Sequence, residues 1–244
     1  MERFNYPGNE LDVFATAKNW KAYWSGEIEK FVGNDILEIG AGIGATAKVF
    51  ARKRYARWVG VEPDDGLCAV IQQEIVDPKL IANYSLVKGT TASIDDMGTF
   101  DTALYIDVLE HIEDDQAELV RVAEKVRGGG RIIVISPAHG LLFSEFDKKI
   151  GHYRRYDKKS LRAIVPDGLE VEKLFYLDSV GLLASLANKL FLRSDSPTLA
   201  QVQLWDRVMV RLSRILDRIT LHRIGKTIVC VLRKPQGNEE NAVL

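Results

Sequence analysis

Five short apolar runs recur in the first part of the chain, and segments of helical period separate most of them. The runs are continuously hydrophobic rather than alternating, which is typical of strands that are buried on both faces of a parallel sheet. The pattern therefore predicts an α/β fold with a doubly wound, Rossmann-like sheet. The five expected strands are Ile36–Ile39, Trp58–Val61, Ser85–Val87, Asp101–Ile106 and Arg131–Ile135.

The pattern changes after the fifth run. We expect a helix over Asp157–Ile164 that is capped by Asp157, and a sixth and a seventh strand over Leu169–Leu177 and Lys226–Leu232. A mainly helical segment lies between these two strands, and its apolar part, Val180–Leu192, is shorter than the roughly 20 residues that cross a bilayer. We predict a helical cover over residues 1–34, a main domain over 35–235 with a helical insertion over 178–225, and a flexible tail over 236–244.

Composition excludes several protein classes. Of 244 residues, 46% are hydrophobic and 27% are charged, which is ordinary for a globular domain and excludes a disordered chain, a collagen-like repeat or a coiled coil. The chain opens without the basic and apolar segments of a secretory signal, and it has only two cysteines, Cys68 and Cys230. We therefore expect a cytoplasmic protein whose thiols are reduced.

The net charge of −1 conceals an uneven distribution. Residues 1–140 carry 15 Lys and Arg against 22 Asp and Glu, a balance of −7, whereas residues 141–244 carry 18 against 12, a balance of +6. The later part of the chain is therefore the better candidate for contact with an anionic partner.

One stretch of this basic part has helical spacing. Arg207, Arg211, Arg214 and Arg218 would form one stripe of a helix, opposite an apolar face. We expect an amphipathic helix whose apolar face packs on the sheet or on the partner subunit of a homodimer. Its arginines would lie in solvent. The alternative is a cover that recognises a phosphorylated or lipid-linked acceptor, or a peripheral contact with an anionic membrane. A sequence pI of about 6.5 argues against nucleic acid. The predicted apolar face comprises Trp205, Val208, Met209, Leu212, Ile215, Leu216 and Ile219.

A glycine-rich turn follows the first strand. Gly40, Gly42 and Gly44 would allow a tight turn and let a ligand lie against bare backbone. Glu62 ends the second strand, where an acidic side chain can bind ribose hydroxyls, so the pair also fits a dinucleotide-binding fold. Glu38 helps to decide which kind of ligand the turn would bind. Its carboxylate would repel a pyrophosphate but would attract a ligand with an ammonium and a sulfonium group.

Four motifs in succession resemble those of the class I S-adenosylmethionine-dependent methyltransferases. They are Glu38–Gly44, Val61–Pro63, Tyr105–Ile112 and Gly128–Arg131, and the resemblance covers about residues 30–235. It implies a seven-stranded sheet whose last strand is antiparallel, and S-adenosyl-L-methionine as the cofactor.

The resemblance also implies roles for single residues. Glu38 and the glycines Gly40, Gly42 and Gly44 would border the methionine end of the cofactor, and Glu62, with Pro63 after it, would hold the ribose diol. Thr90 and Thr91 would lie near adenine, although many relatives carry an acidic residue at the position of Thr90. Asp107 would lie beside the methionine moiety and the substrate.

Acidic and imidazole groups follow the fourth strand. Asp107, Glu110 and His111 have the spacing i, i+3 and i+4, so they would share one face of a helix that starts at Asp107. Transfer of a methyl group to a hydroxyl needs an aligned nucleophile and usually a base. His111 and His152, on a loop after the fifth strand, are the two candidate bases.

The same residues also suggest a metal site. Asp107, Glu110, His111 and His152 resemble the Glu-x-x-Glu-His motif and later histidine of metal-dependent O-methyltransferases, although the first acid here is one methylene shorter. Most relatives with Asp-Val-Leu-Glu-His work without metal, so we predict none.

These observations predict a methyltransferase that acts on a hydroxyl of a small-molecule or lipid-linked acceptor. Two alternatives stay open, an NAD-dependent oxidoreductase and a partner subunit that binds the cofactor without catalysis. The sequence leaves the acceptor, O against N or C methylation, metal dependence and the oligomeric state undecided.

Overall fold

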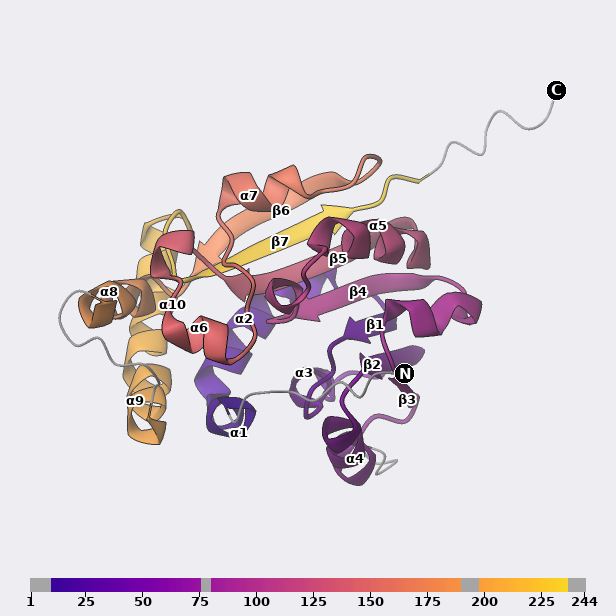
Figure 1. The fold of residues 1–244 in the computed structure, drawn as a ribbon, viewed down its shortest axis with the longest axis horizontal. Helices are drawn as coiled ribbons and strands as arrows, with labels where there is room; N and C mark the ends of the chain where they lie inside the picture. The colour runs from indigo at the N-terminus through magenta and orange to yellow at the C-terminus, as the bar shows by residue number, and fades with distance from the viewer. Residues whose placement is uncertain (1–9, 76–79, 190–197, 237–244) are drawn as a thin grey trace.

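The computed structural model describes residues 10–75, 80–189 and 198–236, and in this part of the chain seven strands form one sheet. The strand order is β3-β2-β1-β4-β5-β7-β6, and β7 runs antiparallel to both of its neighbours (Figure 1). The predicted doubly wound sheet with an antiparallel last strand is therefore confirmed. The strands are β1 Asp35–Ile39, β2 Arg57–Glu62, β3 Tyr84–Lys88, β4 Phe100–Ile106, β5 Val126–Pro137, β6 Glu170–Leu177 and β7 Thr227–Arg233.

Helices cover both faces of the sheet. The N-terminal pair is α1 Glu10–Ala15 and α2 Lys18–Ile28, and the crossover helices are α3 Ala45–Phe50, α4 Asp65–Glu74 and α5 Asp115–Lys125. Then follow α6 Glu145–Lys149, α7 Lys158–Ala163, α8 Ser179–Ala187, α9 Leu199–Leu204 and α10 Val210–Ile219. Shorter helical turns are Glu29–Phe31, Thr91–Met97, Leu109–His111 and Gly140–Leu142. Asp157 caps α7 as predicted, because its carboxylate accepts the backbone N–H groups of Lys159 and Ser160 at 2.8 and 2.7 Å.

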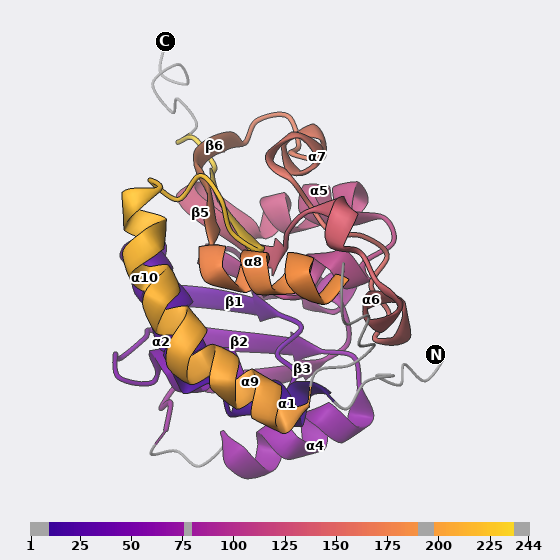
Figure 2. The same ribbon diagram turned by 90° about the vertical axis from the view of Figure 1, so that its left-hand side faces the viewer.

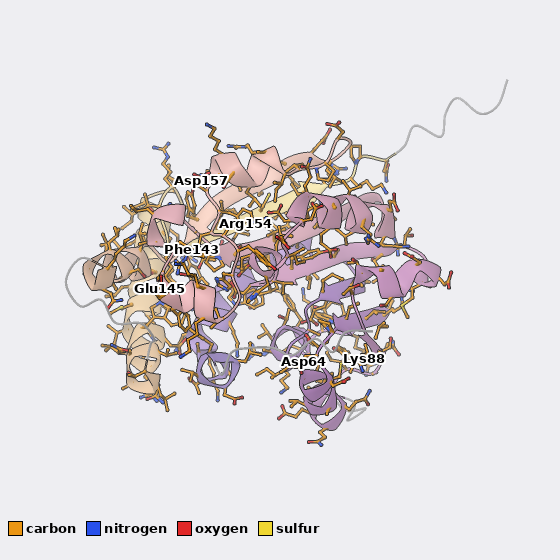
Figure 3. All side chains as sticks on the ribbon, viewed as in Figure 1. Asp64, Lys88, Phe143, Glu145, Arg154 and Asp157 are labelled. Carbon is orange, nitrogen blue, oxygen red and sulfur yellow. The ribbon has the colours of Figure 1, made fainter. Side chains whose placement is uncertain are left out.

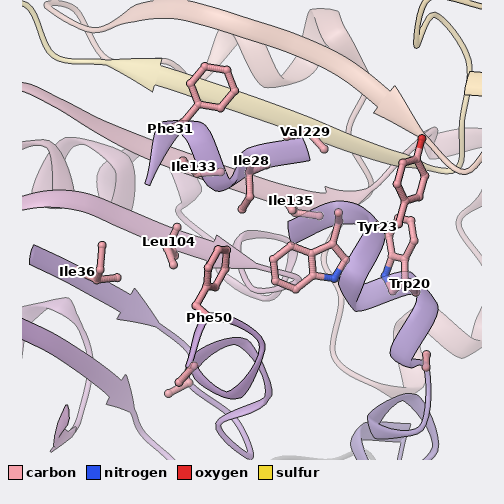
Figure 4. Packing of buried hydrophobic residues seen from close by; sticks show 14 of the residues in the cluster. Trp20, Tyr23, Ile28, Phe31, Ile36, Phe50, Leu104, Ile133, Ile135 and Val229 are labelled. Atoms are coloured by element: carbon pink, nitrogen blue, oxygen red, sulfur yellow. The ribbon is translucent and has the colours of Figure 1, made fainter. Parts of the chain in front are cut away.

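Alternate residues of each strand point to two separate cores. Ile133 and Ile135 of β5 pack with α2 and α3 on one face (Figure 4), whereas Ile132 and Val134 pack with α5 and α7 on the other. All four side chains are fully buried. Burial on both faces explains why the strands read as unbroken apolar runs.

A long helix between β6 and β7 differs from its prediction. It consists of α9, a π-helical turn over Trp205–Met209, and α10, and it lies along the outside of the molecule beside α1 and α2 (Figure 2). Within the predicted apolar face Trp205 is buried, but Leu212, Ile215 and Ile219 are exposed. The predicted packing of this face on the sheet is therefore wrong, and its packing on a partner subunit stays a prediction.

The buried face combines apolar side chains, Val202, Trp205 and Val210, with polar ones. Asp206 accepts the backbone N–H of Trp20 at 2.8 Å, and Asp217 accepts the N–H of Asp178 at 2.7 Å and the hydroxyl of Tyr23 at 2.8 Å. These bonds satisfy the first N–H groups of α2 and of α8. Hydrophobic periodicity does not reveal which side of the helix is buried here, because hydrogen bonds make part of the contact.

Some predicted features lie outside the described residues. They include the tail from residue 237 onward, the first nine residues of the predicted cover, and residues 190–197 of the insertion. Among the described residues, no helix is both long and apolar enough to cross a membrane. The domain boundaries stay predictions.

Candidate active site

A large cleft opens at the carboxyl ends of the parallel strands, the place where ligands bind in open α/β sheets. Its volume is about 2080 Å³, and its wall includes the glycine loop after β1, the ends of β2 and β4, and residues of α2, α6, α8 and α9. Lys88 marks the glycine-loop end of the cleft in Figure 3, and Phe143 and Glu145 mark the end beside α6. The predicted site residues that line it are Gly40, Gly42, Glu62, Pro63, Thr90, Thr91, Asp107, His111 and His152.

All three glycines of the loop adopt a left-handed backbone. Their φ angles are 65° at Gly40, 57° at Gly42 and 71° at Gly44, which is unfavourable for other residues. A Cβ at Gly40 would lie 2.5 Å from Val108, and one at Gly44 would collide with Ile75, whereas a Cβ at Gly42 would meet only open space and one carbonyl at 4.0 Å. Gly40 and Gly44 therefore pack the loop, and Gly42 presents bare backbone to the cleft.

Glu62 holds this loop in place. Its carboxylate accepts the backbone N–H of Gly42 at 2.8 Å and that of Asp64 at 3.0 Å. Burial raises the pKa of Glu62, and these two hydrogen bonds oppose the rise. Because a carboxylate can accept about four hydrogen bonds, Glu62 keeps acceptor capacity on the side of the cleft.

Glu38 lies apart from the cleft wall. It is buried beneath the loop, and its carboxyl accepts the indole N–H of Trp58 at 2.7 Å. Burial raises its pKa to about 8, against the effect of hydrogen bonds from Trp58 and Thr46. Glu38 is therefore mostly neutral at pH 7, and the electrostatic argument that separated the two cofactor classes is weaker than the sequence suggested.

The predicted adenine end contains an acid that sequence reasoning missed. Glu118 of α5 lines the cleft with Thr90 and Thr91, and it accepts the hydroxyls of Thr91 and Tyr105, both at 2.7 Å. It lies 28 positions after Thr90, so a search for an acid next to Thr90 could not find it.

No helix starts at Asp107, so the predicted shared helical face of Asp107, Glu110 and His111 is wrong. Asp107 has a φ of 54°, and only a short 3₁₀ turn follows over Leu109–His111. This turn directs Glu110 into the interior, where it accepts the hydroxyl of Ser136 at 2.9 Å. Asp107 faces the cleft, and Glu110 borders it from the interior.

The pKa values of Asp107 and Glu110 are both raised. The surrounding protein raises the pKa of Asp107 to about 6, and the charges of His152 and Lys226 oppose the rise. Burial, and then repulsion from Asp107, raise the pKa of Glu110 well above its usual range. The two carboxyl groups therefore resist being charged at the same time.

His152 is held by a buried carboxylate. Its Nδ1 lies 3.0 Å from Asp147, which also accepts two hydrogen bonds from the guanidinium of Arg155, each 2.9 Å long. Burial alone would raise the pKa of Asp147, but hydrogen bonds from His152, Arg155 and Ser144 hold it well below its ordinary value. Because Asp147 is charged, the Nδ1 of His152 carries a proton and donates it in this hydrogen bond. The lone pair of Nε2 is then available to accept a proton. Sequence reasoning missed Asp147 and Arg155, although both flank the His152 segment.

His111 contacts His152 edge to face, with the ring centroids 4.4 Å apart. Burial, together with the neighbouring His152, lowers the pKa of His111 to about 4, so that its ring is neutral at pH 7. One ligand atom each from Glu110, His111 and His152 lie within 4.8 Å of one another. The structure thus brings together three of the four residues of the suggested metal set, and Asp107 lies outside this group.

Residues 37–134 match a family model described as a methyltransferase domain. A ubiquinone biosynthesis O-methyltransferase of Azorhizobium caulinodans is 35% identical to this chain over 103 residues. The match covers 42% of this chain and 40% of that protein, so the chain spans less than half the length of the curated relative that it matches.

Solved structures of low sequence identity share the fold. A methyltransferase of Archaeoglobus fulgidus has a TM-score of 0.59 at 14% identity, over 92% of this chain and 97% of the other. A Haemonchus contortus phosphoethanolamine N-methyltransferase, in complex with phosphomonomethylethanolamine and S-adenosylhomocysteine, has a TM-score of 0.61 at 17% identity, over 93% of this chain and 56% of the other. The [4+2]-cyclase SpnF has a TM-score of 0.62 at 16% identity, over 94% and 95%. The reaction must therefore be argued from the site.

Proposed function

We propose that this chain is a class I S-adenosylmethionine-dependent methyltransferase that methylates a hydroxyl group of a small-molecule or lipid-linked acceptor. The match of residues 37–134 to a methyltransferase domain supports the cofactor class. The observation that carries the proposal is the contact of His152 with Asp147 in the cleft wall.

The glycine-loop end of the cleft fits the cofactor. Gly42 offers backbone without a side chain, and Glu62 offers free acceptor capacity for a ribose diol. Thr90 and Thr91 border the proposed adenine position, and Asp107 the proposed methionine position. When bound, S-adenosylmethionine supplies a methyl group on a positively charged sulfur. Asp107, beside the proposed methionine position, can favour this charge.

His152 is the proposed general base. Its Nε2 would take the proton of the acceptor hydroxyl, so that the oxygen could accept the methyl group that the cofactor would supply. Asp147 acts as a positioning residue, because it orients the imidazole and stabilises the imidazolium that forms. His111, with a pKa of about 4, is a much weaker base at neutral pH, so the structure favours His152 over His111.

The test is a product screen. The protein, methyl-labelled S-adenosylmethionine and an extract fractionated into aqueous and lipid phases are incubated, and labelled products are identified by mass spectrometry. We expect a methyl ether whose formation requires His152. A labelled amine or C-methylated product would contradict the assignment to a hydroxyl, and turnover of NAD(H) would favour the oxidoreductase alternative. Cofactor binding without turnover of any acceptor would favour the partner-subunit alternative.

A metal-assisted form of the same reaction has its own supporting observation. Glu110 Oε1 is buried without a hydrogen-bond partner among the described residues, and it lies 3.9 Å from Nε2 of His152. Two imidazoles and one carboxylate suit a divalent transition metal, which would lower the pKa of an acceptor hydroxyl. Our prediction remains a reaction without metal. Loss of activity with EDTA and its return with added Zn²⁺ or Mn²⁺ would overturn that prediction.

A further inference from the structure

The long helix exposes a continuous apolar stripe to solvent. Its members follow one another at steps of four, four, three and four residues, so they lie along one side of the helix. A run of large apolar side chains at such exposure is unusual for a surface without a partner. The stripe comprises Leu204, Val208, Leu212, Ile215 and Ile219, with exposed fractions of 53%, 48%, 49%, 61% and 71%.

The helix cannot turn this stripe inward without losing buried hydrogen bonds. Ser213 donates to the carboxylate of Asp178 at 2.7 Å and accepts the N–H of Val180 at 3.1 Å. Asp206 and Asp217, described above, bind the starts of α2 and α8 from the same buried side. Leaving such groups unpaired in the interior costs about 1–3 kcal/mol each. The fold therefore fixes the stripe on the outside.

A row of arginines runs parallel to the stripe. Each of Arg207, Arg211, Arg214 and Arg218 directly precedes one stripe residue, so the row lies about 100° around the helix from it. All four are exposed. The acids within residues 198–225 are Asp206 and Asp217, both buried and hydrogen-bonded. The charge that this helix presents to solvent is therefore entirely positive.

We propose that this surface docks on the headgroup region of an anionic lipid bilayer. A helix with one apolar and one basic side lies in the plane of the interface, where its apolar side chains enter the acyl boundary. The arginines then extend toward lipid phosphates. A second copy of the chain fits less well, because a two-fold contact through the stripe with antiparallel helices would bring two arginine rows together.

The docking surface adjoins the cleft. Leu204 is a member of the stripe and also lines the cleft, next to Trp205, and Figure 2 shows the long helix crossing this side of the molecule beside α8. Docking would place the cleft wall next to the lipid surface, which suits an acceptor that resides in the membrane. The docking does not depend on methyl transfer, so it goes beyond the proposed function.

The test is co-sedimentation of the full chain with phosphatidylcholine vesicles that contain or lack phosphatidylglycerol. We expect binding to the anionic vesicles, and a decrease at about 0.5 M salt, where the Debye length falls to roughly 4 Å. The triple variant Leu212→Gln, Ile215→Gln and Ile219→Gln should bind the anionic vesicles at least about tenfold more weakly than the wild type. The matched control is Val120→Gln, an exposed apolar residue of α5, which should bind like the wild type.

Two further measurements show whether the triple variant is still folded and still binds S-adenosylhomocysteine. Circular dichroism and calorimetry with S-adenosylhomocysteine should be unchanged in the triple variant, because its three side chains are exposed and Gln favours helices. Equal vesicle binding by the wild type and the triple variant would overturn the proposal, as would failure of the wild type to bind anionic vesicles. A dimer in ultracentrifugation that the triple variant breaks, without vesicle binding, would assign the stripe to a second copy instead.

Discussion

The two ends of the cleft are built from different kinds of sequence. At the proposed cofactor end, the Gly40–Gly44 loop and Glu62 belong to two short segments at the ends of adjacent strands, and one hydrogen bond joins Glu62 to Gly42. At the proposed acceptor end, Asp107 and Glu110 follow β4, whereas Asp147 of α6 and His152 belong to the segment after β5. The remaining wall there belongs to α2, α8 and α9.

Because the two groups of residues lie at different ends of the cleft, we expect substitutions to affect cofactor binding and catalysis separately. A change at the cofactor end should alter affinity for S-adenosylhomocysteine and leave proton transfer intact. A change at the acceptor end should do the reverse. The predictions below test this separation.

The largest effect is expected from His152→Ala. Loss of the general base should lower turnover by about 10²- to 10⁴-fold while the affinity for S-adenosylhomocysteine stays within about twofold. Steady-state kinetics and calorimetry on the same preparation measure both quantities. Added imidazole should restore part of the activity.

His111→Ala serves as the matched comparison for that variant. Because the pKa of His111 lies near 4, its removal should cost less turnover than removal of His152. A greater loss in His111→Ala would reverse the assignment of the base. Asp147→Asn should fall between the two, with a changed pH profile of turnover rather than a changed acceptor KM.

A smaller effect is expected at the other end of the cleft. Glu62→Ala should weaken the binding of S-adenosylhomocysteine by about tenfold to a hundredfold, or roughly 1.5–3 kcal/mol, because it removes charge-assisted hydrogen bonds. Calorimetry measures this change, and Glu124→Ala, an exposed acid of α5, is the control. Unchanged affinity in a folded Glu62→Ala protein would remove Glu62 from the cofactor site.

Beneath the glycine loop, Glu38 should make stability depend on pH. Its pKa is about 8 in the fold against an ordinary value of 4.5, so the folded state holds the proton more tightly, and stability decreases as pH rises through this window. From pH 6 to pH 8 the decrease should be about 2 kcal/mol. Urea denaturation at both values tests this, and in Glu38→Gln the decrease should be smaller by that amount. An equal decrease in the variant and the wild type would contradict the raised pKa.

The sequence predicted the backbone of the glycine loop better than that of the segments around Asp107 and His152, for physical reasons. Buried parallel strands and left-handed glycines impose local patterns, and these patterns located β1, β2 and the loop at Gly40–Gly44. The acceptor end depends on long-range contacts. The bonds of Asp147 with Arg155 and His152, and the left-handed Asp107 that prevents a helix, depend on the packed fold.

The long helix shows the same limit. Its apolar period correctly indicated a helix, but the side that faces the protein carries Asp206, Ser213 and Asp217 beside the apolar Val202, Trp205 and Val210. Each of these polar residues satisfies a backbone or side-chain donor on a distant segment. A hydrophobic pattern identifies an amphipathic helix without saying which side is covered.

The most direct test of the account is calorimetric titration of the wild-type chain with S-adenosylhomocysteine and, in parallel, with NAD⁺. We predict saturable one-to-one binding of S-adenosylhomocysteine that Glu62→Ala weakens and His152→Ala does not, and no binding of NAD⁺. Binding of NAD⁺ in place of S-adenosylhomocysteine, or binding that His152→Ala weakens as much as Glu62→Ala, would contradict both the cofactor assignment and the separation of the two ends of the cleft.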